Sequence, residues 1–292
     1  MLQLGLIGYP LGHSLSPVIH GAAMRDLGLE GEYRLYPTLP LPAGEREMEG
    51  LLQRVSSGEL QGLNVTIPHK QAVLRWIDEL SGEARDTGAV NTIYYADGHL
   101  AGDNTDVAGF MHDLSNQLPV NISNGRALVL GAGGSARAVV YALRRIGWGV
   151  IIAARRVSQA EELINDIASR NRQMDVIELS AARLEAVLNS TREPNLLNLI
   201  VNTTPVGMAP NVDDSPWPDG VPFPPEAFVY DLVYNPLETR LVNDARRAGL
   251  EACNGLGMLV EQAALSFERW TGLTAPRQSM MEAAMKSQSE RK

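Results

Sequence analysis

The sequence predicts an α/β protein with two domains, on three observations. The chain has 292 residues, about twice the length of a typical domain, and 45% of them are hydrophobic, which is enough for two cores. Short apolar runs alternate with stretches of helical spacing, as in βαβ units with largely parallel sheets. A polar segment at 119–125 separates two such series, so we expect a domain border close to it.

The first series contains three predicted strand–helix pairs. The strands are expected at Leu4–Gly8, Tyr33–Tyr36 and Leu63–Ile67, and the helices at Pro17–Leu27, Arg46–Val55 and Gln71–Leu80. The stretch Ala89–Tyr95 and the turn Ala96–Gly98 then indicate one arm of a hairpin, followed by a helix at Ala108–Leu118.

The second series has a doubly wound pattern, with predicted strands at Ala127–Leu130, Val150–Ala154 and near Val176, Leu199 and Val229, and helices at Ser135–Ile146 and Gln159–Ser169. Pro205–Pro225 is rich in Pro and Asp and is expected to be a surface loop. Helical spacing returns after Gly257, runs through Trp270 and resumes at Pro276–Lys286, so this terminal pair could pack on the first domain. We therefore predict a mainly parallel α/β domain made of residues 1–104 and 256–292, with a second domain, 105–255, inserted into it.

Composition excludes several classes of protein. The net charge of −9 and a pI near 5.1 argue against nucleic acid as a partner, because that affinity depends on clustered Lys and Arg. No apolar run approaches the roughly 18 residues of a membrane span, and Met1–Pro10 is expected to be a strand and loop rather than a signal peptide. A single cysteine, Cys253, fits a reducing compartment, so we expect a cytoplasmic location and a small-molecule partner.

The turn Gly131-Ala132-Gly133-Gly134-Ser135-Ala136 matches the dinucleotide-binding fingerprint, with Ala136 in the third small position. Glycines allow the backbone to approach a pyrophosphate, whose charge is then bound by N–H groups at the helix start. A strand precedes this turn and a helix follows it, so we predict a Rossmann-type domain. The alternative is a glycine turn that only connects a strand to a helix.

Arg155 and Arg156 follow the second strand of this domain, where a carboxylate would bind the ribose of NAD. Two guanidinium groups favour a 2′-phosphate instead, and therefore NADP. The alternative is that both are solvated charges at a helix entry.

Lys70 is the only lysine outside the C-terminal tail. The tail contains Lys286 and Lys292, and all other Lys or Arg positions are arginines. It follows a short strand on which Asn64 and Thr66 share one face, and ligands collect at such carboxyl ends in α/β sheets. A lysine of this kind is a candidate proton-transfer group, although most single lysines are surface charges.

Two further segments combine polar side chains with a helix start. Gly102–Asp106 offers carboxylates before a helix, where Asp103 or Thr105 could simply be a cap, and Ser14 and Ser16 precede Pro17 in the same way. The five histidines and Cys253 show no metal-ligand spacing, so no metal is expected.

Taken together, these segments resemble the shikimate dehydrogenase family, in the family's order, from about residue 4 to 275. The segments are Gly12–Pro17, Asn64–Lys70, Gly88–Thr92, Asn104–Asp106, the glycine turn, Asn202–Met208, Asp231–Pro236 and Asn254–Met258 with Gln262. The resemblance implies NADP-dependent, reversible reduction of 3-dehydroshikimate to shikimate in aromatic amino-acid biosynthesis.

The resemblance also implies roles for individual residues. Lys70 and Asp106 would be the catalytic pair, also contacting substrate. The other substrate-binding residues would be Ser14 and Ser16 for the carboxylate, with Asn64, Thr66, Asn91, Tyr234 and Gln262 around the hydroxyls. The cofactor would be lined by Gly131 to Ala136, Arg155, Asn202, Thr203, Leu232 and Gly255. Two positions depart from the family: Ala154-Arg155-Arg156 replaces Asn-Arg-Thr, and Val107 replaces a glycine.

A carboxylate beside Lys70 would favour its ammonium form, so we predict that Lys70 is mainly protonated and gives its proton to the carbonyl oxygen during reduction. Three alternatives stay open: a quinate or dual quinate/shikimate dehydrogenase using NAD(P), a methylene-tetrahydrofolate dehydrogenase, and a catalytically silent ligand-sensing protein. Asn104–Asp106 and the Ser14/Ser16 pair fit a methylene-tetrahydrofolate dehydrogenase poorly. A homodimer is also left open.

Overall fold

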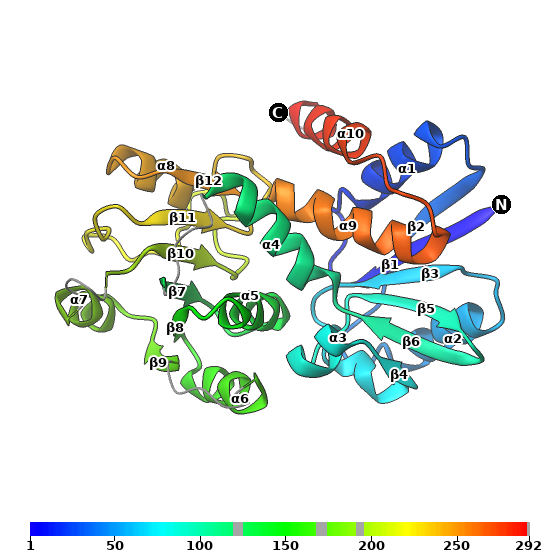
Figure 1. Ribbon diagram of the computed structural model, residues 1–292, viewed down its shortest axis with the longest axis horizontal. Coiled ribbons are helices and arrows are strands. Elements are labelled where there is room, and N and C mark those ends of the chain that lie inside the picture. The colour runs from blue at the N-terminus through cyan, green and yellow to red at the C-terminus, as the bar shows by residue number, and fades with distance from the viewer. Residues whose placement is uncertain (119–124, 168–173, 191–195, 291–292) are drawn as a thin grey trace. The chain divides into compact units, whose positions relative to one another are not determined.

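The computed structural model describes residues 1–118, 125–167, 174–190 and 196–290. They form two compact units, Met1–Gly109 with Leu259–Lys292, and Phe110–Met258 (Figure 1). The units divide within helices α4 (Thr105–Gln117) and α9 (Leu256–Thr271), whereas the sequence placed the borders at the starts of these helices. Of the polar segment predicted at 119–125, only Gly125 lies within the described residues.

The first unit contains a mixed six-stranded sheet in the order β2-β1-β3-β5-β6-β4. Strand β1 is parallel to β2 and β3, and β4 is parallel to β6, but β5 is antiparallel to both β3 and β6. The hairpin turn at Asp97 and Gly98, both at positive φ, makes β5 and β6 antiparallel. The strands are β1 (Leu2–Gly8), β2 (Gly31–Pro37), β3 (Gly62–Val65), β4 (Glu79–Leu80), β5 (Thr92–Ala96) and β6 (His99–Asp103).

One face of this sheet packs against α2 (Glu45–Ser56). Its buried residues Met48, Leu51, Leu52 and Val55 have helical spacing and join the sheet residues in one core. The short elements that follow are η1 (Ala72–Trp76) and α3 (Gly82–Thr87).

The helix predicted at Gln71–Leu80 is wrong in its second half, where the chain forms β4. Asp78 accounts for the change: its N–H donates to the carbonyl of Leu100 at 2.9 Å, and its carboxylate accepts from the N–H of Leu100 at 2.8 Å. This contact with the start of β6 is a tertiary interaction, which local spacing does not encode.

α1 (Ser16–Asp26) and α9 supply residues to the opposite face, and α10 (Arg277–Ser289) packs against α1, so the terminal helices return to the first unit as expected. The indole of Trp270 on α9 lies so close to Gly62 that any side chain there would collide with it. The indole N–H also donates to the carbonyl of Ile93 at 3.1 Å. Gly62 therefore allows α9 to lie directly on β3.

The second unit contains a fully parallel sheet in the order β12-β11-β10-β7-β8-β9. This is a doubly wound, Rossmann-type arrangement whose order reverses between β7 and β10, the place where such folds bind ligands. Its strands are β7 (Arg126–Leu130), β8 (Gly149–Ala154), β9 (Met174–Glu178), β10 (Leu199–Asn202), β11 (Phe228–Asp231) and β12 (Ala252–Asn254). Its helices include α5 (Gly134–Arg145), α6 (Val157–Ile167), α7 (Ala181–Ser190) and α8 (Arg240–Arg247).

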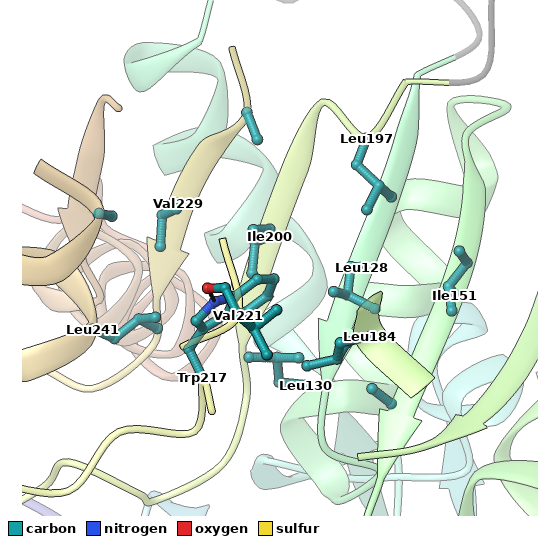
Figure 2. Packing of buried hydrophobic residues seen from close by; sticks show 13 residues of the cluster. Leu128, Leu130, Ile151, Leu184, Leu197, Ile200, Trp217, Val221, Val229 and Leu241 are labelled. Carbon is teal, nitrogen blue, oxygen red and sulfur yellow. Dashed lines mark hydrogen bonds between the residues drawn. The ribbon is translucent and has the colours of Figure 1, made fainter. Parts of the chain in front are cut away.

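Alternate residues of the central strands build the core of this unit, as Figure 2 shows. Leu128 and Leu130 of β7 point to the same face, where Leu184 of α7 lies next to them, and Leu241 of α8 joins the same core near Val229 of β11. The Pro-rich segment 205–225 has neither helix nor strand, as predicted, but it is not confined to the surface. Its Trp217 is buried in the core and donates to the carbonyl of Val221 at 2.9 Å.

Candidate active site

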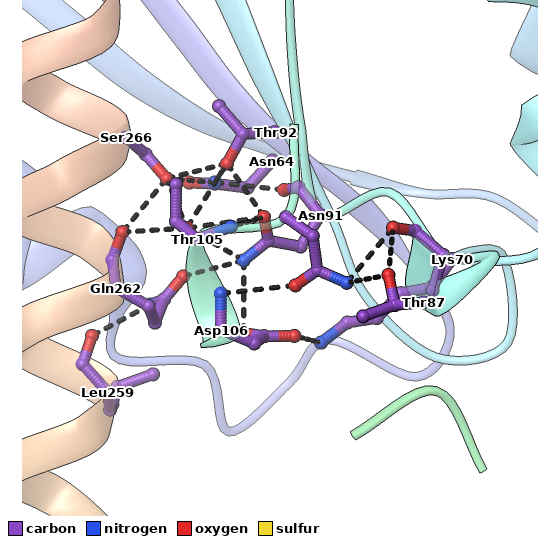
Figure 3. Close-up of polar contacts among 12 residues, drawn as sticks. Asn64, Lys70, Thr87, Asn91, Thr92, Thr105, Asp106, Leu259, Gln262 and Ser266 are labelled. Carbon is purple, nitrogen blue, oxygen red and sulfur yellow. Dashed lines mark hydrogen bonds and ion pairs between the residues drawn. The ribbon is translucent and has the colours of Figure 1, made fainter. Parts of the chain in front are cut away.

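Lys70 and Asp106 form a buried ion pair in the first unit (Figure 3). The Lys70 Nζ lies 2.6 Å from Asp106 Oδ2, and the exposed fractions of the two side chains are 10% and 5%. Lys70 is near the end of β3, and Asp106 is in the first turn of α4. The following residue, Val107, is buried.

Asn91 holds the other carboxylate oxygen of this pair. Its Nδ2 donates to Asp106 Oδ1 at 3.0 Å and to the Thr105 hydroxyl at 2.9 Å, while its Oδ1 accepts from the N–H of Thr105 at 2.8 Å. Gln262 of α9 accepts a longer bond from the same Nδ2, at 3.3 Å. The structure thus brings four of the predicted site residues, Lys70, Asn91, Asp106 and Gln262, into one network.

The start of α4 is capped by Asn104, whose Oδ1 accepts from the N–H of Asp106 at 3.2 Å. The prediction that Asp103 or Thr105 caps this helix is therefore wrong. Asp103 instead accepts from Ser81 at 2.6 Å and from Arg269 of α9 at 2.7 Å. Because Asn104 precedes the helix, its side chain reaches the unpaired N–H at the position of the catalytic candidate itself.

Asn64 is buried within the sheet, and both ends of its carboxamide have partners. Its Oδ1 accepts from the Tyr33 hydroxyl at 2.8 Å, and its Nδ2 donates to the carbonyl of Asn91 at 3.1 Å and to the Ser266 hydroxyl at 2.9 Å. Thr66 lies just beyond β3 and is half-buried. Its N–H donates to the carbonyl of Ile7, which keeps the segment leading to Lys70 alongside β1.

Three hydroxyl groups complete this network, and sequence reasoning gave none of them a role in the site. Ser266 Oγ lies 2.7 Å from Thr92 Oγ1 and 3.1 Å from Thr105 Oγ1, and it donates to the carbonyl of Gln262 at 2.9 Å. Ser266 is four residues after Gln262 on α9, so the two share one face of the helix. That spacing was the available signal.

Ser14 and Ser16 lie at the start of α1. Ser16 is the first helical residue rather than the cap, and no side chain caps this helix. The Ser14 hydroxyl accepts from the N–H of Ser16 at 3.2 Å. Ser14 is half-buried and Ser16 is buried, so neither residue is fully exposed to solvent.

In the second unit, the glycine turn joins β7 to α5. Gly131 has φ +107°, a conformation that L side chains rarely adopt, and a Cβ there would lie 2.7 Å from Thr203 Oγ1. Gly133 precedes α5 with open space where a Cβ would be, and no side chain caps the helix start. This uncapped helix start, with room in front of it, fits the pyrophosphate of a dinucleotide.

The remaining residues of the turn support the same geometry. Ala132 and Ala136 are buried, Ala136 completely, while Gly134 and Ser135 are half-buried in the first turn of α5. Small residues here allow the helix to pack closely on the sheet.

Arg155 and Arg156 follow the carboxyl end of β8 and are both exposed. Arg156 donates to Gln159 Oε1 at 2.8 Å, an exposed contact at the start of α6. The two guanidinium groups therefore follow the strand end at which such folds bind the adenosine ribose of a dinucleotide. A 2′-phosphate on that ribose would suit two positive charges there.

Asn202 ends β10 and is fixed by Asp231 at the end of β11. Its Nδ2 donates to Asp231 Oδ1 at 2.8 Å, and its Oδ1 accepts from the Thr204 hydroxyl at 2.7 Å. Burial raises the pKa of Asp231 to about 6, although hydrogen bonds from Thr239, Val233 and Asn202 oppose the rise. The sequence analysis included Asp231 in the segment Asp231–Pro236 but gave it no role of its own.

The last predicted residues lie on the adjoining loops of the second unit. A Cβ on Gly255 would collide with the backbone of Leu232, so these two lie in contact. Thr203 donates to the carbonyl of Leu130 at 2.7 Å, beside Gly131. Tyr234, predicted to contact substrate, also belongs to this unit and is half-buried.

Within the described part of the chain, no group of three His, Cys, Asp or Glu side chains could hold a metal ion. No helix in the described ranges is long and apolar enough to cross a bilayer.

Comparisons with known proteins identify the family. Residues 6–93 match the family model for the shikimate dehydrogenase substrate binding domain, and 255–285 match the shikimate 5'-dehydrogenase C-terminal domain. A shikimate dehydrogenase (NADP(+)) from Methanopyrus kandleri is 40% identical over 97% of this chain and 94% of that protein.

Two solved structures are similar over nearly the whole chain. Shikimate 5-dehydrogenase from Thermus thermophilus, in complex with NADP(H) and shikimate, has a TM-score of 0.82 at 38% identity and covers 98% of this chain and 100% of its own. Quinate dehydrogenase from Corynebacterium glutamicum, in complex with NAD, has a TM-score of 0.85 at 34% identity, over 98% of this chain and 96% of its own. On the extent of these similarities, this chain belongs to the shikimate dehydrogenase family.

Proposed function

We propose that this chain is an NADP-dependent shikimate dehydrogenase, which interconverts 3-dehydroshikimate and shikimate. The buried Lys70–Asp106 pair carries the proposal. Among the residues that the structure describes, Asp106 is the only hydrogen-bond partner of Lys70 Nζ. An ammonium group has three N–H donors, so two are left for the oxygen of a ligand.

Substrate recognition would use the polar groups around this pair. Ser14 and Ser16 would bind the carboxylate, since hydroxyl groups at an uncapped helix start donate to anions. The hydroxyl groups on the substrate ring would be bound by Asn64, Thr66, Asn91, Tyr234 and Gln262. The shikimate complex of the Thermus thermophilus relative supports a substrate of this class.

Proton transfer is the step that the protein itself performs. In reduction, the Lys70 ammonium donates a proton to the carbonyl oxygen as the carbonyl carbon receives a hydride, and in oxidation the amine recovers that proton from the hydroxyl group. The nicotinamide ring supplies or accepts the hydride when it is bound. Asp106 positions the Nζ group of Lys70, and Asn91 holds Asp106 in place.

The cofactor would be NADP, held by the second unit. The turn from Gly131 to Ala136 would bind the pyrophosphate, and Arg155 with Arg156 the 2′-phosphate. Asn202, Thr203, Leu232 and Gly255 would line the rest of the site. The NADP(H) complex of the Thermus thermophilus relative supports this assignment.

The test is a matrix of two acids and two cofactors, with kcat/KM measured for shikimate and quinate against NADP and NAD. Shikimate with NADP should give the highest value, by at least about 10-fold. The similarity to a quinate dehydrogenase bound to NAD makes quinate the rival substrate. A higher value for quinate with NAD would support that rival, and no turnover in any combination would support a ligand-sensing protein.

Three broader expectations belong to the same proposal. The substrate domain would comprise 1–104 and 256–292 and the cofactor domain 105–255, the location would be the cytoplasm, and a homodimer is an open possibility. Molar mass in solution tests the last of these directly.

A further inference from the structure

We propose that Tyr33 is a positioning residue of this site: its hydroxyl group fixes the carboxamide of Asn64. The inference rests on the proposed function in one respect, namely that Asn64 binds the substrate. Tyr33 lies on β2 and is 6% exposed, so it is not itself a surface contact for a ligand.

The hydrogen bonds of Asn64 show what the hydroxyl group does. Tyr33 donates to Asn64 Oδ1 at 2.8 Å, and within the described residues no other donor reaches that oxygen. The opposite end of the carboxamide donates to the carbonyl of Asn91 at 3.1 Å and to Ser266 at 2.9 Å. A flipped amide would place its oxygen against the Asn91 carbonyl oxygen, so the two ends together allow one orientation.

The burial of Tyr33 keeps its hydroxyl group in the donor form. Burial raises the pKa of Tyr33 above its ordinary value, so the phenol retains the proton that it donates to Asn64.

The ring of Tyr33 cannot readily turn away from these partners. The imidazole of His20 on α1 stacks on it with centroids 4.3 Å apart and planes inclined by 3°. His20 is fully buried, and in the described structure neither of its ring nitrogens has a hydrogen-bond partner. Burial lowers the pKa of His20 to about 3, so the ring stays neutral. Phe267 and Trp270 of α9 lie beyond it, at 6.2 and 5.4 Å between centroids.

The substitution Tyr33→Phe removes the hydroxyl group and keeps the stacked ring. We expect KM for shikimate to rise about 5- to 20-fold, as for the loss of one buried hydrogen bond, with kcat and KM for NADP changed less than about threefold. Tyr95→Phe is the matched control, because Tyr95 is exposed and donates only to the carbonyl of Gly98 in its own hairpin. It should leave all three constants unchanged.

A double-mutant cycle tests whether Tyr33 acts through Asn64. In an Asn64→Ala background, the additional effect of Tyr33→Phe on KM should fall below about twofold, because the bond it removes is already absent. Fully additive effects would overturn the route through Asn64. An unchanged KM in Tyr33→Phe, or equal increases for shikimate and NADP, would overturn the proposal.

A second variant distinguishes loss of the hydrogen bond from a general loss of structure. Replacement of Tyr33 by p-aminophenylalanine restores an N–H donor on the same ring, so KM for shikimate should return to within about threefold of wild type. If it stays as high as in Tyr33→Phe, the donor role is wrong. The wild-type assay separates the two claims, because absence of shikimate turnover there contradicts the proposed function, and the Tyr33 comparison is then made with whichever acid the enzyme uses.

Discussion

The ammonium group of Lys70 and the carboxylate of Asp106 meet at 2.6 Å in a place almost without solvent. Asp106→Asn would keep the size of the side chain and remove its charge, leaving a buried ammonium without its counter-charge. We expect kcat to fall at least about 10-fold and KM for shikimate to rise by a smaller factor. Steady-state kinetics measure this, with the exposed Asp26→Asn as control. A kcat within threefold of wild type would show that the pair is only structural.

Arg155→Ala should change the preference between cofactors. A charged hydrogen bond to a phosphate contributes about 1.5–3 kcal/mol, so KM for NADP should rise at least about 10-fold. KM for NAD, which lacks the 2′-phosphate, should change less than twofold. Arg183→Ala, an exposed arginine on α7, serves as the control for loss of charge. Equal changes for NADP and NAD would rule out a phosphate contact.

His20 should make the first unit sensitive to acid. Its pKa is about 3 in the folded protein and 6.5 without burial, so below pH 6.5 the unfolded chain binds a proton that the folded chain does not. The stability that depends on neutral His20 is complete above pH 6.5 and is lost as the pH falls toward 3. Between pH 7 and pH 5 this loss amounts to about 2 kcal/mol.

His20→Phe keeps a ring against Tyr33 and removes the titrating group. The free energy of unfolding, measured in denaturant at pH 7 and pH 5, should therefore fall by about 2 kcal/mol less in the variant than in wild type. All other titrating groups are common to both proteins and cancel in this comparison. Equal losses would mean that His20 takes up its proton in the folded state.

Gly131→Ala should cost more than an ordinary glycine substitution at positive φ. Gly147 has φ +82° with open space around it, whereas a Cβ at Gly131 would meet Thr203 Oγ1 at 2.7 Å. Both variants carry the backbone penalty, but only Gly131→Ala adds a collision, of about 1–3 kcal/mol. Unfolding free energies of the two variants test this, and KM for NADP should rise in the first alone. Equal destabilisation of the two variants would mean that a Cβ at Gly131 does not collide with Thr203.

Local patterns predicted the parts of the fold that depend on local chemistry. The apolar spacing of α2 and the strand–turn–helix around Gly131 appear in the structure near the predicted bounds. The end of the helix predicted at Gln71–Leu80 was wrong because Asp78 pairs with Leu100, far along the chain. Helices α7 and α8 were missed.

The candidate site likewise contains residues that the sequence predicted and residues that only tertiary contacts reveal. Lys70 and Asp106 stood out in the sequence because of lysine scarcity and a motif, and the structure pairs them. Ser266 and Tyr33 did not, because a serine within a helix and a tyrosine within a strand are ordinary residues until folding brings each to Asn64. Supporting residues of this kind are defined by tertiary contact, which a single sequence does not display.

Lys70→Ala, compared with wild type in shikimate oxidation by NADP, tests the central claim most directly. Wild type should form NADPH and 3-dehydroshikimate at a saturable rate, and the variant should lose at least about 100-fold in kcat with a much smaller change in KM, as expected for removal of the proton-transfer group. Lys286→Ala, in the C-terminal helix α10, should match wild type. Near wild-type turnover by Lys70→Ala would contradict the account.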